Sequence, residues 1–170
     1  KPANIDGASI PELLENLKLP EYRTRYRTRR ELRGRNANEV MQATQAWLKK
    51  LPKDVDERIQ LEALWVSWGA NRIDLELMEK LLKSEDHRIR SGAARVLRFN
   101  LKKTPRRRAW LLAAANDPHG RVRMEAMAAA SYLGKRVGLE ILAAAEAKGI
   151  DKAHRQSFDF AKGVLENAPI

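Results

Sequence analysis

The chain carries one short pattern twice, and the spacing of the two copies restricts what it can fold into. The first copy runs from Leu81 to Leu97 and the second from Leu111 to Ala130. Each has a pair of leucines, an Asp-containing turn, and then Arg-Ile-Arg or Arg-Val-Arg at the start of an alanine-rich stretch. Arg90 and Arg123, which hold the same place in the two copies, are 33 residues apart. A period of this length is typical of stacked helical hairpins.

Weaker copies of the pattern cover 13–32, 47–68 and 141–165, which makes about five hairpins. Apolar residues recur at helical spacing, and no run alternates as a strand does between hairpin turns. We therefore expect an all-α chain with ten helices, near 9–18, 21–33, 36–50, 54–68, 74–83, 86–99, 105–115, 118–133, 136–147 and 151–166. Because no hairpin buries its apolar face alone, the predicted fold is a right-handed α–α superhelix of stacked hairpins. It fills one domain, 9–166, between an N-terminal extension (1–8) and a C-terminal tail (167–170).

The composition excludes several kinds of chemistry. There is no cysteine, so disulfides, thiolate metal sites, cysteine nucleophiles and covalent c-type haem attachment have no residue to use. No apolar run reaches the roughly 18–20 residues of a membrane-spanning helix. Motifs of serine hydrolases, P-loops, dinucleotide sites and zinc proteases are absent, and carboxylates such as Glu57 and Glu62 have ordinary surface spacing. We therefore expect no catalytic residue, no metal ligand and no cofactor-binding residue.

The formal net charge is +11, from 33 Lys+Arg against 22 Asp+Glu. A charge of this size suggests an anionic partner such as nucleic acid, an acidic protein surface or a polyanionic glycan. The alternative is an Arg-rich helical protein with no such partner. Because the sequence begins at Lys1 without a methionine, we expect it to be part of a longer protein.

Four segments carry a resemblance to a known family. They are LPEYRTRYRTRRELRGR (19–35), LEALWVSWG (61–69), DHRIRSGAARVLRF (86–99) and DPHGRVRMEAMAAASYLG (117–134). Together they resemble the HEAT-repeat region, an armadillo-like fold, of large haem-binding, membrane-bound dehydrogenase-like proteins of the planctomycete–verrucomicrobial type. That family has a β-propeller before the HEAT repeats and a CxxCH cytochrome domain after them, and neither is present here. The resemblance implies a connector region of an exported, extracytoplasmic (periplasmic) protein, with c-type haem elsewhere in the parent.

Arginine is concentrated between positions 23 and 35, beside Tyr22 and Tyr26. Guanidinium groups suit phosphate, sulfate and carboxylate, and tyrosines can stack on bases or sugars. A second basic run falls at a predicted loop and helix start. In the alternative interpretation these side chains pair with nearby acids or are solvated. The candidate anion- or partner-binding residues are Arg23, Arg25, Arg27, Arg29, Arg30, Arg33, Lys102, Lys103, Arg106, Arg107 and Arg108.

Aromatic residues give a second set of candidates. Trp65 and Trp68 are three positions apart on one predicted helix, so they lie on adjacent parts of one face. With Tyr22 and Tyr26 they are candidates for a groove that contacts a sugar, base or peptide. The alternative is that the tryptophans fill the core between repeats.

Other positions point to structural roles. In each clear copy, Asp86 or Asp117 is expected to cap the second helix. Arg90 or Arg123 is expected to pair with an Asp or a carbonyl of the neighbouring repeat. Ligand binding by these arginines is the alternative. His87 and His119 precede or open the same helix in the two copies, and we expect turn or capping roles for them rather than metal ligation.

These patterns predict a non-catalytic scaffold or docking module. Its expected partner is a protein or a neighbouring domain of the parent chain, and an acidic partner fits the charge. An alternative is nucleic-acid binding, which needs the two basic clusters to lie on one continuous face. A third hypothesis, an enzyme accessory like the bilin-lyase type of HEAT protein, is supported only by the generic repeat pattern.

Overall fold

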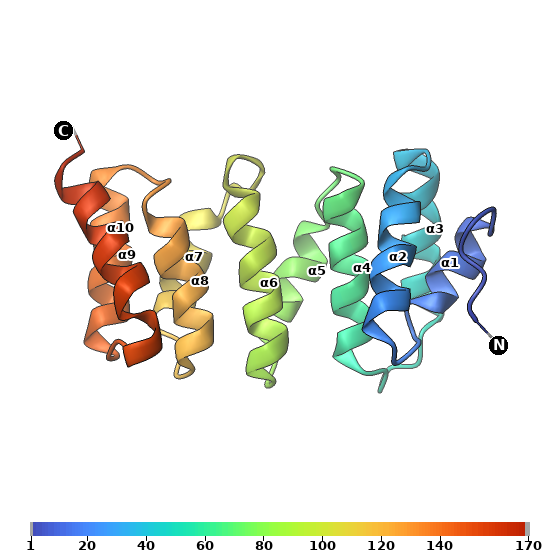
Figure 1. The fold of residues 1–170 in the computed structure, drawn as a ribbon, viewed down its shortest axis with the longest axis horizontal. Coiled ribbons are helices and arrows are strands. Elements are labelled where there is room, and N and C mark those ends of the chain that lie inside the picture. The colour runs from blue at the N-terminus through green and yellow to red at the C-terminus, as the bar shows by residue number, and fades with distance from the viewer. Residues whose placement is uncertain (1, 169–170) are drawn as a thin grey trace. The chain divides into compact units, whose positions relative to one another are not determined.

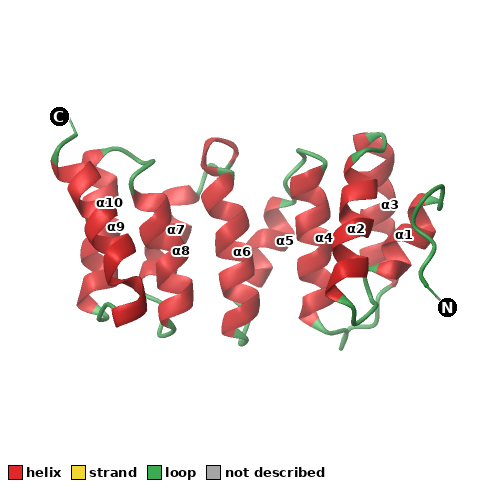
Figure 2. Ribbon diagram, in the orientation of Figure 1, coloured by secondary structure: helices red, strands yellow, loops and turns green. Residues whose placement is uncertain are grey.

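The structure, a computed structural model, describes residues 2–168. Over these residues the chain has ten α-helices, two 3-10 helices and no strand, as the sequence predicts (Figure 1, Figure 2). No helix in this range combines the length and hydropathy needed to cross a membrane. The helices are α1 (Ile10–Asn16), α2 (Tyr22–Arg33), α3 (Ala37–Lys50), α4 (Glu57–Gly69), α5 (Leu75–Leu81), α6 (His87–Phe99), α7 (Arg107–Ala115), α8 (Gly120–Ala130), α9 (Lys135–Ala147) and α10 (Arg155–Glu166).

The chain divides into two compact units, which are described separately. Unit 1 ends at Leu81 and holds α1 to α5, and unit 2 begins at Leu82 and holds α6 to α10. The prediction that 9–166 form one domain, and that the hairpins wind into one superhelix, stays a prediction.

Unit 1 is built from two helical hairpins and one further helix. The hairpins are α1 with α2 and α3 with α4, and α5 packs on α4. Like helices of the two hairpins also pack together, α1 on α3 and α2 on α4, so α2 and α4 lie side by side (Figure 1). The first helix begins with a capping box: Ser9 accepts the Glu12 N–H, and Glu12 accepts the Ser9 N–H. Leu13, Leu14 and Leu17 form part of the buried core.

Unit 2 is organised around α8, which packs against α6, α7, α9 and α10. The alanine-rich stretches of the two clear copies explain this arrangement. Ala93 and Ala94 of α6 and Ala126 and Ala130 of α8 are fully buried, and their small side chains let the helix backbones approach closely. As in unit 1, the second helices of successive hairpins pack on each other.

Four predicted helix starts are two to four residues too early. The fourth helix begins at Glu57 rather than 54, and the tenth at Arg155 rather than 151, after a 3-10 helix over Lys152–His154. The other two each have a local cause. The seventh helix begins at Arg107 because residues 101–103 form a 3-10 helix that Thr104 closes, donating its hydroxyl to the Asn100 carbonyl over 2.9 Å. The eighth begins at Gly120, and its N-cap is His119 rather than Asp117.

Candidate partner-binding surface

Helix α2 sorts its residues onto two faces. Arg25, Thr28 and Leu32 point into unit 1 and are buried. At 100° per residue, the exposed residues occupy one continuous arc on the other side. We call this arc the α2 surface; its members are Tyr22, Arg23, Tyr26, Arg27, Arg30 and Arg33.

The guanidinium groups of the α2 surface have no acceptor among the described residues. The side chains of Arg23, Arg27, Arg30 and Arg33 form no hydrogen bond or ion pair with any residue between 2 and 168. The nearest acid on the helix, Glu31, is bound by Arg35 at 2.6 Å. Like charges three and four positions apart on a helix repel by roughly 0.2–0.5 kcal/mol per pair. Four solvated guanidinium groups therefore lie together at a small cost to the helix.

Two exposed tyrosines complete the α2 surface. Tyr22 is 60% and Tyr26 46% exposed, and their ring centroids are 6.3 Å apart with planes inclined by 25°. Tyr and Trp side chains contribute a large apolar area when they are buried, whereas much of the area of these two rings faces solvent. Arginine beside exposed tyrosine is also the composition found at energetic centres of protein interfaces.

Arg25 belongs to a different class, because it holds the fold together. It donates its Nη1–H to the carbonyls of Leu19 and Pro20 in the turn before α2, and its Nε–H to Glu62 of α4. Arg29, one turn later, also pairs with Glu62 and lies 4.7 Å from the Trp65 ring centroid. These two candidates are thus engaged inside unit 1.

The same arrangement recurs at the fourth residue of α6 and of α8. Arg90 donates its Nη1–H to the carbonyls of Ser84 and Glu85, and its Nε and Nη2 to the carboxylate of Asp117. A carbonyl in a tight turn lacks a helical partner, and each of these arginines supplies two such groups with a donor. We call Arg25, Arg90 and Arg123 the clamp arginines.

Arg123 completes the set. Its Nη1–H donates to the carbonyls of Asp117 and Pro118, and its Nη2–H to Gly149 across to the next hairpin, with Asp151 at 3.7 Å. Arg90 and Arg123 therefore each contact an Asp or a carbonyl beyond their own helix, Asp117 and Gly149 respectively. That these contacts join neighbouring repeats stays a prediction.

Asp86 and Asp117 differ in what they do. Asp86 caps α6 by accepting the Arg88 N–H at 2.8 Å, as predicted, and it also binds the Arg88 guanidinium. Hydrogen bonds from the Arg88 side chain and backbone lower the pKa of Asp86 to about 2. Asp117 instead accepts from Arg90 and from the His119 N–H. Burial raises the pKa of Asp117, but these hydrogen bonds outweigh it and leave the pKa below its ordinary value.

Trp65 and Trp68 are half-buried rather than exposed like the tyrosines. Trp65 stacks under the Arg29 guanidinium on the buried edge of α2. The two tryptophans are therefore neither fully buried in the core nor exposed in an open groove, the two alternatives that the sequence suggested.

The second basic run is more heterogeneous. Lys102 and Lys103 are exposed on the 3-10 helix after α6. Arg106 lies 5.5 Å from the Trp110 ring centroid, and Arg108 forms a 2.6 Å ion pair with Glu140, while Arg107 is exposed. This run belongs to unit 2 and the α2 surface to unit 1.

His87 and His119 form a contact that sequence reasoning missed. Their rings are stacked with centroids 3.6 Å apart and planes inclined by 12°. His119 also caps α8, since its Nδ1 accepts the Arg121 N–H at 3.2 Å, which confirms the predicted capping role. The signal was their equivalent place in two adjacent repeats. In the described part of the chain, no group of three or more His, Cys, Asp or Glu side chains could hold a metal ion.

Two buried carboxylates were also missed. Glu62, predicted to be an ordinary surface residue, is 1% exposed. Glu125, at the same position of α8 as Glu62 of α4, is 2% exposed. Burial raises the pKa of Glu125 despite Arg98 at 3.0 Å and Arg95 at 4.0 Å. One oxygen, Oε2, accepts no well-directed hydrogen bond from the described residues.

Comparisons with known proteins add no identification. No protein-family model, no curated protein and no solved structure matches this chain. The resemblance to the HEAT region of haem-binding proteins stays a prediction from the quoted segments.

Proposed function

We propose that this chain is a non-catalytic docking module that binds an anionic partner through the α2 surface. One observation carries the proposal: four arginines without an acceptor in the described residues share one helix face with two exposed tyrosines. An anion on this face would relieve the repulsion between neighbouring guanidinium groups and gain charge-assisted hydrogen bonds. Arg25 supports the proposal, because it ties α2 to the turn before it and to Glu62 of α4 and so pre-organises the surface.

In this proposal the hairpins are HEAT-like repeats in a right-handed superhelix. The quoted segments and the recurrence of the clamp arginines support that assignment. The module would be a connector of a larger extracytoplasmic dehydrogenase-like protein, with its partner a neighbouring domain or a separate protein. Any c-type haem would belong to the parent, since this chain has no cysteine to attach it.

Nucleic-acid binding is a second candidate, and the charge distribution of unit 2 favours it. From Leu82 onward the sequence has 18 Lys+Arg against 9 Asp+Glu, so most of the +11 charge lies there. Binding to phosphates would weaken steeply with salt, with a log–log slope of roughly −0.9 per phosphate contacted on duplex DNA. Affinity that does not change with salt would rule this candidate out.

The docking proposal is tested by titrating the purified chain into three labelled probes: a Glu-rich peptide, oligo-dT and a heparin oligosaccharide. Fluorescence anisotropy reports binding. We expect at least one probe to bind, and the double variant Arg27→Glu/Arg30→Glu to weaken it by about tenfold or more.

The matched control is Lys49→Glu/Lys50→Glu, two exposed residues at the end of α3 in the same unit. It changes the net charge by the same amount but leaves the α2 surface intact, so binding should persist. If neither pair of changes affects any probe, the α2 surface is not a docking site.

A further inference from the structure

We infer that the occupant of the α2 surface is a short Asp/Glu-rich segment of a protein rather than a nucleic acid. The inference rests on the proposed docking function and specifies its partner. Three features of unit 1 carry it: the short reach of the surface, the charge around it, and the contacts that the Tyr22 ring already makes.

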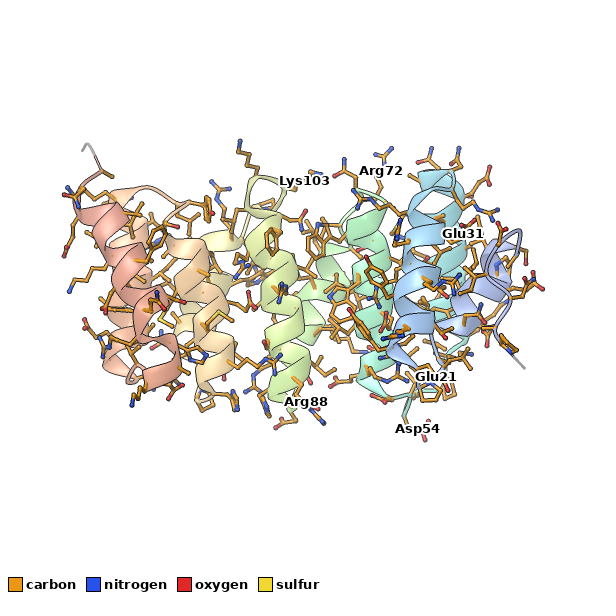
Figure 3. The ribbon with its side chains drawn as sticks, viewed as in Figure 1. Glu21, Glu31, Asp54, Arg72, Arg88 and Lys103 are labelled. Atoms are coloured by element: carbon orange, nitrogen blue, oxygen red, sulfur yellow. The ribbon has the colours of Figure 1, made fainter. Side chains whose placement is uncertain are left out.

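The α2 surface is short and has acids near both ends. Arg23 and Arg33 are ten residues apart on one helix, or about 15 Å along its axis. Glu21 lies just before α2, and Asp54 lies at the same end of the unit as Glu21 (Figure 3). Glu31, which pairs with Arg35, lies near the C-terminal end of α2. A nucleic-acid strand that continued past the arginines would approach these carboxylates. A peptide segment of about five extended residues would not need to, since each residue spans about 3.3 Å.

The charge of unit 1 is nearly balanced outside this strip. Up to Leu81 the sequence has 15 Lys+Arg against 13 Asp+Glu, and four of the basic residues are the α2-surface arginines. Nucleic-acid affinity depends on a broad basic field that displaces many counterions. A local strip of positive charge in a near-neutral unit instead suits a ligand with a local cluster of negative charge.

The exposed Tyr22 ring already has a neighbour on each side around the helix, which leaves less room for a base to stack on it. Arg25 and Arg29 lie on one side of Tyr22 around the helix, with guanidinium carbons 5.9 and 5.8 Å from its centroid. Tyr26 lies on the other side, stacked at 6.3 Å. Single-strand binding needs open aromatic faces. The phenolic hydroxyls remain available as hydrogen-bond donors to carboxylates.

The arginine spacing matches a ligand with regularly placed carboxylates. Arg23, Arg27 and Arg30 follow one another at four and three positions, which is also how Glu residues at i, i+4 and i+7 lie on a partner helix. A guanidinium group binds a carboxylate through two parallel N–H···O bonds, which fixes orientation as well as affinity. The α2 surface would therefore bind best to an acidic helix or strand whose carboxylates are spaced as these arginines are.

Competition titrations test the inference. The labelled probe is a twelve-residue peptide rich in Glu and Asp; its Gln/Asn counterpart, oligo-dT and a heparin oligosaccharide are competitors. We expect the acidic peptide to bind, the Gln/Asn peptide not to compete, and Arg27→Glu/Arg30→Glu to weaken binding about tenfold or more. The control pair Lys49→Glu/Lys50→Glu should bind as the unaltered chain does.

A tyrosine variant adds an independent readout. Tyr22→Phe/Tyr26→Phe keeps both rings and removes both hydroxyls, so it should weaken the peptide about threefold or more. Unchanged peptide affinity would contradict the assigned hydroxyl contacts.

Two further outcomes separate this inference from the docking function. Tighter binding of oligo-dT or heparin than of the peptide, abolished by Arg27→Glu/Arg30→Glu, would overturn the inference and leave docking standing. If Arg27→Glu/Arg30→Glu weakens binding to none of the probes, both the docking function and this inference are wrong.

Discussion

Arg25 and Glu62 face each other across the packed helices α2 and α4, with the Nε of Arg25 2.8 Å from Oε1 of Glu62. Their side chains are only 10% and 1% exposed. Arg29 binds the other oxygen of the same carboxylate, so one buried acid pairs with two guanidinium groups. This cluster separates the structural arginines of α2 from those of the α2 surface.

Replacing Glu62 with Gln should destabilise the protein strongly. The variant leaves Arg25 and Arg29 with no opposing charge in a largely dry site, and breaking a buried pair typically costs about 3–5 kcal/mol. The midpoint of urea unfolding, followed by circular dichroism, measures the loss. Glu39→Gln is the control, because Glu39 is exposed in the first turn of α3. It should shift stability by about 0.5 kcal/mol or less. Equal midpoints for the two variants would contradict this view of the cluster.

Glu125→Gln should have the opposite effect from Glu62→Gln at neutral pH. Burial raises the pKa of Glu125, so its charged form is disfavoured in the folded chain even with Arg98 and Arg95 nearby. A neutral isostere removes that penalty, and we expect an unfolding midpoint equal to or above that of the unaltered chain at pH 7.

The pH dependence of Glu125 gives a sign that can be checked. Because its pKa is higher in the folded than in the unfolded chain, the folded state binds the proton more tightly. Its contribution to stability is fullest below the ordinary value of 4.5 and is lost as pH rises through the folded pKa. The stability of Glu125→Gln relative to the unaltered chain should therefore improve as pH rises from about 4 to 7. A relative loss over that range would mean that the arginines outweigh burial.

Asp86 should make the protein sensitive to acid. Arg88 holds the pKa of Asp86 at about 2, below its ordinary value of 3.8. An acid with a lowered folded pKa contributes stability above its unfolded pKa, and this contribution is lost as pH falls from about 4 through 2. Asp86→Asn keeps a cap at the start of α6 but not the charge, so unfolding scans should show a weaker acid dependence. An identical acid dependence in both proteins would refute the role of Asp86.

The helices were predictable because their signals are local. The spacing of apolar residues can be read within each segment alone, and it predicts the ten helices. The contacts of Arg90 and Arg123 could also be predicted, since the same sequence pattern around these two arginines indicates the same local contacts.

The burial of Glu62 and Glu125 could not be predicted in the same way. The spacing of each acid along its helix is that of a surface residue. Its burial is explained only by the arginines of a helix packed beside it, which are on α2 for Glu62 and on α6 for Glu125. The separation of α2 into a buried and an exposed face could have been predicted, because Arg25 shares a helical face with Thr28 and Leu32. We instead treated the seven arginines between 23 and 35 as one cluster.

Gly138 and Gly163 give opposite predictions for the same substitution. A Cβ at Gly138 would lie 2.6 Å from the Ala130 carbonyl oxygen and 2.7 Å from the Leu165 methyl groups. Gly138→Ala must therefore push α9 away from its neighbours, at a cost of about 1–3 kcal/mol.

At Gly163 a Cβ would meet nothing within 4 Å, and the residue lies inside α10. Gly163→Ala should stabilise the protein by about 0.5–1 kcal/mol, because alanine loses less backbone freedom than glycine when a helix forms. Thermal unfolding of the two variants measures both effects against one reference. If Gly138→Ala stabilised the protein, helix propensity alone would govern both sites. That result would show that α9 is not packed against α8 and α10 as closely as the structure has it.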